Sequence, residues 1–497
     1  MARIVVIGAG MGGMAAAARL RIKGHDVTVI EASTTYGGKL GTLRRDGFEF
    51  DTGPTLFTLP AVYRDLFLKT GRRLEECIEL VALEPGCTYR FADGSRLDMP
   101  GAGVGRAAEA MGDALGGRAA DDWRALIARA GRMWTAIRRP LLESPLTGAR
   151  DLIPLARDLD TLRVVAPWQT LRTLGRRMLS DPRARQLLDR YATRTGSDPR
   201  RAPAALSILP YVESTFGVWH VSGGLRGLAD ALRNRLNERG VQLFLETRAV
   251  RIALDGGRVS GVGLEDGEVL PADIVVANAD ASQVYGELLG PAAPTHPRRR
   301  LARSTLSMSG FTIMLAVSGR TPAVSHHNVW FPADPDAECD AIFSTPSPVD
   351  DPTIHACVPA DPAMRPDGCQ AWTVLVGAPR HSPGGREPGT IDWDAPGLAE
   401  QYADHVLRRL AERGTDLTGR ILWRRLRTPA DLQRATGAPG GSIHGTASHG
   451  LRAAFLRPHN ATAIPGLFLV GGSAHPGGGL PLVALSAEIV ANLVGRG

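Results

Sequence analysis

The fold is decided by the stretch Ile4-Val5-Val6-Ile7-Gly8-Ala9-Gly10-Met11-Gly12-Gly13. Its four apolar residues predict a buried strand, its glycines predict a tight turn, and the alanine-rich run that continues to Leu20 predicts a helix. A second apolar run, Val27-Thr28-Val29-Ile30, predicts another strand that ends at Glu31. The order strand, glycine turn, helix and strand predicts a βαβ unit built on a parallel sheet.

The glycines and Glu31 together indicate a dinucleotide site. Gly8 allows the tight turn, Gly10 leaves room for a pyrophosphate to approach the backbone, and Gly13 lets the helix pack close to the sheet. Free N–H groups and the positive end of the helix dipole converge on that pyrophosphate. Glu31 is placed to accept hydrogen bonds from ribose hydroxyls, and its charge disfavours the 2′-phosphate of NADP.

Composition narrows the class of protein. The chain has 497 residues, 43% hydrophobic and 22% charged, which predicts a globular protein with two or three substructures. Its five cysteines form no CxxC pair, so we expect reduced thiols, no metal and no disulfide framework. No apolar run approaches a membrane span, and Met1-Ala2-Arg3 leads directly into the first strand, so neither a spanning helix nor a secretory signal is expected.

The net charge of +7 is weak evidence for a nucleic-acid partner, because the cationic side chains are nearly all Arg and no nucleic-acid module is present. Changes of pattern along the chain divide it into alternating segments. We expect a nucleotide-binding domain in three pieces (1–85, 206–285 and 456–497), a substrate domain in two (86–120 and 286–455), and a helical subdomain (121–205) whose short helices are separated by prolines.

Two further motifs identify the dinucleotide by resemblance. Gly37-Gly38-Lys39 and the segment from Phe50 through Asp51 to Pro54 resemble loops of the amine-oxidase and phytoene-desaturase group of FAD enzymes. Three more motifs narrow the resemblance to bacterial carotenoid desaturases over essentially the whole chain: Gly217-Val218-Trp219-His220, His326-His327-Asn328-Val329 and His475-Pro476-Gly477-Gly478-Gly479-Leu480-Pro481.

The resemblance implies an α/β fold with a Rossmann-like FAD-binding domain, a discontinuous mixed-sheet substrate domain and a helical, membrane-associating subdomain. It also implies that the last helix points at the N1/C2 edge of the flavin. The expected FAD-binding residues are Gly8, Ala9, Gly10, Met11, Gly12, Gly13, Glu31, Ala32, Gly38, Lys39, Gly53, Pro54, Thr55, Val250, Gly471, Gly472, Leu480 and Pro481.

The implied reaction is desaturation of a carotenoid such as phytoene, with hydride passing to flavin N5. The motif continues as Leu480-Pro481-Leu482, which resembles enzymes that act on hydroxylated or already unsaturated carotenoids. No catalytic side chain is assigned. His220 and His475 are candidates, although histidines in Gly/Pro turns more often cap backbone groups, and His326-His327 lacks a third ligand at an informative spacing, so no metal is predicted.

The remaining expectations concern partners and alternatives. No second nucleotide fingerprint is found, which favours oxygen or a membrane quinone over NAD(P)H as electron partner. Trp123, Trp134 and Trp168 beside arginines favour helices lying on a bilayer surface, and hence a cytoplasmic protein held peripherally at the membrane. The alternatives are an FAD-dependent isomerase, another polyisoprenoid oxidoreductase, and a flavin amine oxidase.

Overall fold

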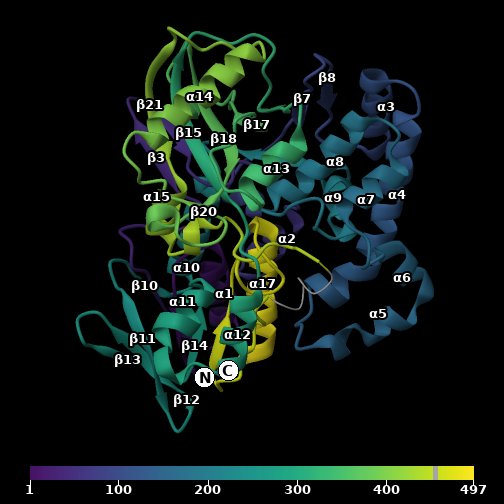
Figure 1. Cartoon of the computed structure of the whole chain (residues 1–497). Coiled ribbons are helices and arrows are strands. Elements are labelled where there is room, and N and C mark those ends of the chain that lie inside the picture. The colour runs from purple at the N-terminus through teal and green to yellow at the C-terminus, as the bar shows by residue number, and fades with distance from the viewer. Residues whose placement is uncertain (451–456) are drawn as a thin grey trace.

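A five-stranded parallel sheet forms the base of the molecule (Figure 1). The computed structural model describes residues 1–450 and 457–497, apart from the side chains at positions 149, 152, 154 and 156. The order of the sheet is β10 (Gln242–Phe244), β2 (Asp26–Ile30), β1 (Arg3–Ile7), β14 (Ile274–Ala277) and β22 (Leu467–Leu469). Its strands come from three distant parts of the sequence and are nearly all apolar, because both faces of the sheet are covered.

Helices cover one face of this sheet. The helix α1 (Met11–Ile22) is buried along most of its length, packed between the sheet, α17 (Leu480–Val494) and α10 (Arg226–Glu238). Its small side chains, four of them consecutive alanines, allow this close packing. The other face is covered by the antiparallel sheet β11 (Ala249–Asp255), β12 (Arg258–Leu264) and β13 (Val269–Pro271), followed along the chain by α11 (Ala281–Gln283) and α12 (Thr295–Arg303).

A seven-stranded mixed sheet lies above the base (Figure 1). Its order is β21 (Ile421–Arg427), β15 (Ser309–Ser318), β18 (Cys369–Ala378), β17 (Ile354–Cys357), β16 (His327–Trp330), β7 (Cys87–Arg90) and β8 (Arg96–Met99). All neighbours are antiparallel except β16 and β7. Buried aromatic residues pack α14 (Leu398–Glu412) against this sheet. Three further helices of eight or nine residues lie elsewhere in the chain: α2 (Ala61–Lys69), α13 (Pro335–Phe343) and α15 (Pro429–Thr436).

A helical unit stands beside both sheets, on the right of Figure 1. It consists of α3 (Val104–Leu115), α4 (Ala119–Ile137), α5 (Ile153–Arg157), α6 (Leu159–Val165), α7 (Leu171–Met178), α8 (Pro182–Arg194) and α9 (Ile208–Phe216). Trp123 is 1% exposed in the core of this unit and Trp134 is 7% exposed in the core that the unit shares with the parallel sheet, whereas Trp168 is 69% exposed. The expectation that all three tryptophans lie on a bilayer surface is therefore wrong for Trp123 and Trp134, which pack against neighbouring helices.

Short strands connect these units. They are β3 (Thr42–Arg45) with β4 (Phe48–Asp51), β5 (Phe57–Thr58) with β9 (Val218–Val221) and β6 (Leu80–Ala82), and β19 (Arg380–His381) with β20 (Thr390–Ile391). The expected domain boundary between 455 and 456 lies outside the described residues. In the described part of the chain, every helix is too short or too polar to cross a bilayer.

Candidate functional site

One cavity of about 1980 Å³ lies where the parallel sheet, the seven-stranded sheet and the helical unit meet. Most of the residues expected from the sequence line it, although they come from segments more than 400 positions apart. The lining includes Gly8, Gly10, Met11, Gly12, Glu31, Ala32, Gly38, Lys39, Gly53, Pro54, Thr55, Gly471, Gly472, Leu480 and Pro481. Ala9 and Gly13 lie just behind this wall, and Val250 is 45% exposed while its neighbour Ala249 lines the cavity.

The turn after β1 leaves no room for a side chain at its glycine positions. Gly8 has a φ of +94°, and a Cβ at Gly13 would overlap the carbonyl oxygen of Gly8, so the helix can approach the strand only with glycine there. A Cβ at Gly10 or Gly12 would lie 2.6 Å from Nδ2 or 2.7 Å from Oδ1 of Asn278. Asn278 follows β14 and was not among the residues expected from the sequence.

Glu31 joins the glycine turn to the end of β2. Its carboxylate accepts hydrogen bonds from the backbone N–H of Ala9 at 2.8 Å and from the N–H and hydroxyl of Ser33 at 2.9 Å each. At the start of α1, Gly10 offers no capping side chain within the described residues, so the first N–H groups of the helix face the cavity. The turn therefore presents hydrogen-bond donors and a carboxylate at adjacent positions.

Lys39 links the loop after β2 to the loop that contains Ser442 and Ile443. Its ammonium donates to the carbonyl oxygens of Ser442 at 3.0 Å and Ile443 at 2.9 Å, and burial lowers its pKa to about 8. A Cβ at Gly53 would overlap the carbonyl oxygen of Lys39, which explains the glycine there. Nearby, buried Asp51 accepts the backbone N–H groups of Leu225 (3.0 Å) and Arg226 (3.3 Å) at the start of α10, and burial raises its pKa to about 6.

Arg457 supports the C-terminal glycine loop and was not predicted. Its buried guanidinium donates to the carbonyl oxygens of His444 at 3.1 Å, Thr446 at 2.7 Å and Gly472. Among the described residues its hydrogen-bond acceptors are all carbonyl oxygens, and burial lowers its pKa to about 10. Next to it, α17 begins at Leu480 after Gly479, again without a side-chain cap among the described residues. Positive charge and a helix N-terminus therefore meet at this end of the cavity.

The two candidate histidines make backbone and carboxylate contacts. His220 on β9 lies 2.9 Å from Asp361, away from the cavity wall. His475 lines the cavity, its Nε2 lies 3.0 Å from the carbonyl oxygen of Ser144, and burial lowers its pKa to about 4. A neutral imidazole that contacts a carbonyl group fits the capping interpretation.

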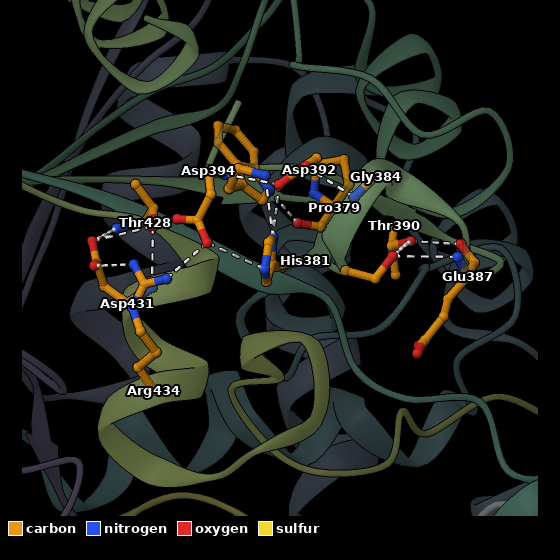
Figure 2. A network of polar contacts seen from close by, with 12 residues as sticks. Pro379, His381, Gly384, Glu387, Thr390, Asp392, Asp394, Thr428, Asp431 and Arg434 are labelled. Carbon is orange, nitrogen blue, oxygen red and sulfur yellow. Dashed lines mark hydrogen bonds and ion pairs between the residues drawn. The ribbon is translucent and has the colours of Figure 1, made fainter. Parts of the chain in front are cut away.

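Within the part of the chain that the structure describes, two groups of side chains have the composition of a metal site. His326 and His327 lie with Cys357, their ligand atoms within 4.8 Å of one another, and Cys357 is the third residue that the sequence spacing did not reveal. The second group is His381 with Asp392 and Asp394 (Figure 2). There, His381 Nδ1 accepts the backbone N–H of Trp393 at 3.2 Å.

Asp394 in that second group also accepts a hydrogen bond from Arg434 at 2.8 Å, and Arg434 donates a second hydrogen bond to Asp431 at 2.7 Å (Figure 2). Because Arg434 and Asp431 belong to α15, this network ties the loop after β20 to that helix.

The nucleotide end of the cavity fits FAD. The glycine cradle excludes side chains from the place where a pyrophosphate would lie, and the open N–H groups of α1 point toward it. Glu31 is available for a ribose, and the start of α17 and Arg457 line the same cavity.

The chain is similar to known flavoproteins. The family model for flavin-containing amine oxidoreductases matches residues 11–381. The chain is 32% identical to a 4,4′-diapolycopene oxygenase from a Methylomonas species, with 98% of this chain and 97% of the relative covered. It is 34% identical to a zeta-carotene-forming phytoene desaturase from Myxococcus xanthus (98% and 93% covered) and 34% identical to a hydroxyneurosporene desaturase from Rubrivivax gelatinosus (98% and 92% covered).

Solved structures match the fold from end to end. Putrescine oxidase bound to putrescine superposes with a TM-score of 0.65 at 14% identity, covering 99% of both chains. Cyclohexylamine oxidase from Brevibacterium oxydans IH-35A gives a TM-score of 0.63 at 16% identity, covering 99% of this chain and 98% of the other. At these identities the likeness establishes the α/β fold.

Proposed function

The chain belongs to the flavin-containing amine oxidoreductases, and on that premise we propose that this FAD-dependent oxidoreductase desaturates a carotenoid in carotenoid biosynthesis. The observation that carries the proposal is the apolar continuation of the cavity beyond the nucleotide loops. Its wall there is formed by Trp134, Ile137, Leu141, Leu142, Leu146, Leu155, Leu162, Val165, Leu206, Leu209 and Val212.

This wall suits a long hydrocarbon better than an amine. Burying apolar surface is worth about 25 cal/mol per Å², so a polyisoprenoid gains binding free energy along its whole length. A soluble amine offers little apolar surface and would gain little binding free energy along this wall. The substrate class of the relatives, carotenoids by their names, agrees with the shape and chemistry of the cavity.

The chain's own residues orient the substrate and exclude water. FAD, when bound, supplies the hydride acceptor for one of the two hydrogens removed, and the other leaves as a proton. The glycines at positions 8, 10 and 12 and the start of α17 line one part of the cavity, and apolar side chains of the helical unit, among them Leu162 and Leu209, line another part. Dehydrogenation of an allylic C–C bond spreads positive charge along the polyene, so no buried carboxylate is required as base.

The helical unit supports a further part of the proposal, the collection of substrate from a membrane surface. Leu162 and Val165 of α6 line the cavity, whereas Leu159 at the start of the same helix is 66% exposed and Trp168 just after it is 69% exposed. Large apolar side chains on both the inner and the outer side of this segment suit a cavity mouth lying against lipid. Oxygen or a membrane quinone is the proposed final electron acceptor.

An anaerobic experiment tests the function. The FAD-loaded protein is mixed with phytoene or neurosporene in liposomes, and flavin absorbance is followed together with product mass. Bleaching with loss of two hydrogens is expected. A product of unchanged mass would indicate the isomerase, and bleaching by soluble amines alone would indicate an amine oxidase. A product that gains oxygen under air would favour the chemistry named for the Methylomonas relative.

A further inference from the structure

Part of the cavity wall is polar and buried, in contrast to the leucine-rich wall around it. Six cavity-lining residues form what we call the polar chamber: Arg190, Tyr191 and Arg194 of α8, Glu213 of α9, His327 of β16 and His355 of β17. The helical unit and the seven-stranded sheet contribute opposite sides of it. The proposed hydrocarbon chemistry uses none of these groups.

A carboxylate and its donors form one side of the chamber. The Tyr191 hydroxyl donates to Glu213 Oε2 at 2.8 Å, and Arg194 donates to Glu213 Oε1. Burial raises the pKa of Tyr191 well above its ordinary value, so this phenol stays protonated and keeps donating. Arg194 and Glu213 thus carry an ion pair on the wall of a cavity that is otherwise suited to hydrocarbon.

The other side of the chamber contains an unsatisfied histidine. His327 is 2% exposed, its Nδ1 lies 3.3 Å from Nε2 of His355, and its own Nε2 has no hydrogen-bond partner among the described residues. Burial lowers the pKa of both imidazoles well below the usual value, so both are neutral. A buried polar atom without a partner costs free energy, which a ligand with a polar group would remove.

The chamber lies close to the C-terminal glycine loop. The carbonyl oxygen of Arg194 accepts a hydrogen bond from His444 Nε2 at 3.0 Å, and a Cβ at Gly478 would overlap the ring of His444. Burial lowers the pKa of His444 to about 4, so a neutral imidazole ring lies between Arg194 and Gly478. A polar group held in the chamber therefore sits near the loop that precedes α17.

We propose that the polar chamber binds an oxygen on the polyisoprenoid, so that the preferred substrate carries a hydroxyl group near the bond that is oxidised. A hydroxyl both donates and accepts, and it therefore satisfies His327 Nε2 in either tautomer. This inference rests on the proposed desaturation. Of the hydroxylated and the already unsaturated carotenoids that the sequence motif suggests, it selects the hydroxylated ones and assigns the residues that would recognise the hydroxyl group.

The test compares two carotenoids of equal length and unsaturation, one with a terminal hydroxyl and one without. The FAD-loaded protein is reduced anaerobically by each, and kcat/KM is taken from flavin bleaching. We expect a preference of at least about tenfold for the hydroxylated compound, on the scale of one buried hydrogen bond. Equal values for the two compounds overturn the inference and leave desaturation standing, whereas bleaching by neither overturns both.

Variants then locate the selectivity. His327→Leu removes the open nitrogen and is expected to bring the preference toward one, chiefly through KM, while His327→Gln restores part of it. His326→Leu is the matched control, because His326 is the adjacent, half-buried imidazole that lies off the cavity wall. If His327→Leu does not fold, Tyr191→Phe serves instead, since it loses only the hydroxyl that contacts Glu213. A preference unchanged in the folded chamber variant, or lost equally in His326→Leu, contradicts the assignment.

Discussion

At the scale of single residues, position 13 is one at which the packing of α1 against β1 requires glycine. A Gly13→Ala variant places a methyl group against the carbonyl oxygen of Gly8 and forces α1 away from β1. Overpacking of this kind costs about 1–3 kcal/mol, and the displaced N–H groups hold a pyrophosphate less well. We therefore expect lower FAD content in the purified protein, measured by flavin absorbance, and a lower unfolding midpoint.

Gly105→Ala is the control for that variant. Gly105 lies inside α3, and a Cβ there meets no atom within 4 Å, so alanine is expected to stabilise the helix slightly by its better propensity. If both variants retain FAD equally, the close approach of α1 to β1 is not what holds the cofactor.

Asp51 makes stability depend on pH. Its folded pKa is about 6 against an ordinary 3.8, because burial penalises the charged form more than two backbone N–H groups favour it. Between these values the folded state binds more protons than the unfolded state, so this residue's contribution falls as pH rises from about 4 to about 6. Asparagine does not titrate, so the free energy of unfolding of Asp51→Asn is expected to rise relative to that of the wild type as the pH increases through this window, by up to about 3 kcal/mol. Urea unfolding of both proteins at pH 4.5 and 7.5 measures this change. A difference independent of pH would contradict the raised pKa.

At the scale of elements, local patterns predicted what local physics determines. The β1–α1–β2 unit follows from an apolar run, a glycine turn and an alanine-rich helix, all within 30 residues. The surroundings of the tryptophans in the helical unit were harder to predict, because amphipathic spacing shows that a helix has an apolar side but not what covers that side. Neighbouring helices cover Trp123 and Trp134, and only Trp168 remains exposed.

The exposed segment at α6 supports a prediction about membranes. Replacing Leu159 and Trp168 by Ser removes two large apolar side chains, 66% and 69% exposed, while leaving the cavity-lining Leu162 in place. We expect the double variant to float less with anionic liposomes than the wild type, by at least about a factor of ten in partitioning. Replacing the exposed Leu422 of β21, which lies on the seven-stranded sheet, by Ser is the control. Equal flotation of all three proteins would place the membrane contact elsewhere.

At the scale of the whole molecule, most of the loops expected from the sequence line the cavity, but the residues that join them were not predicted. Gly8, Glu31 and Gly471 stand in recognisable motifs, whereas Asn278 and Arg457 make their contacts only after distant segments have assembled. The polar chamber is the extreme case. Its members come from α8, α9, β16 and β17, and each residue alone resembles an ordinary core or surface position.

The assembly of one cofactor site from distant segments predicts how FAD stabilises the fold. The parallel sheet joins residues 3–30, 242–277 and 467–469, and the cavity-lining loops follow these strands. A ligand that binds only the folded state adds about 2.7 kcal/mol at a hundredfold excess over its Kd. We expect added FAD to raise the unfolding midpoint of the flavin-free protein by several degrees. FMN lacks the adenylate half that Glu31 and the glycine turn are positioned to hold, so we expect it to raise the midpoint much less. Glu31→Gln should reduce the FAD shift without changing the FMN shift. Equal shifts from FAD and FMN would mean that the turn after β1 does not hold the dinucleotide.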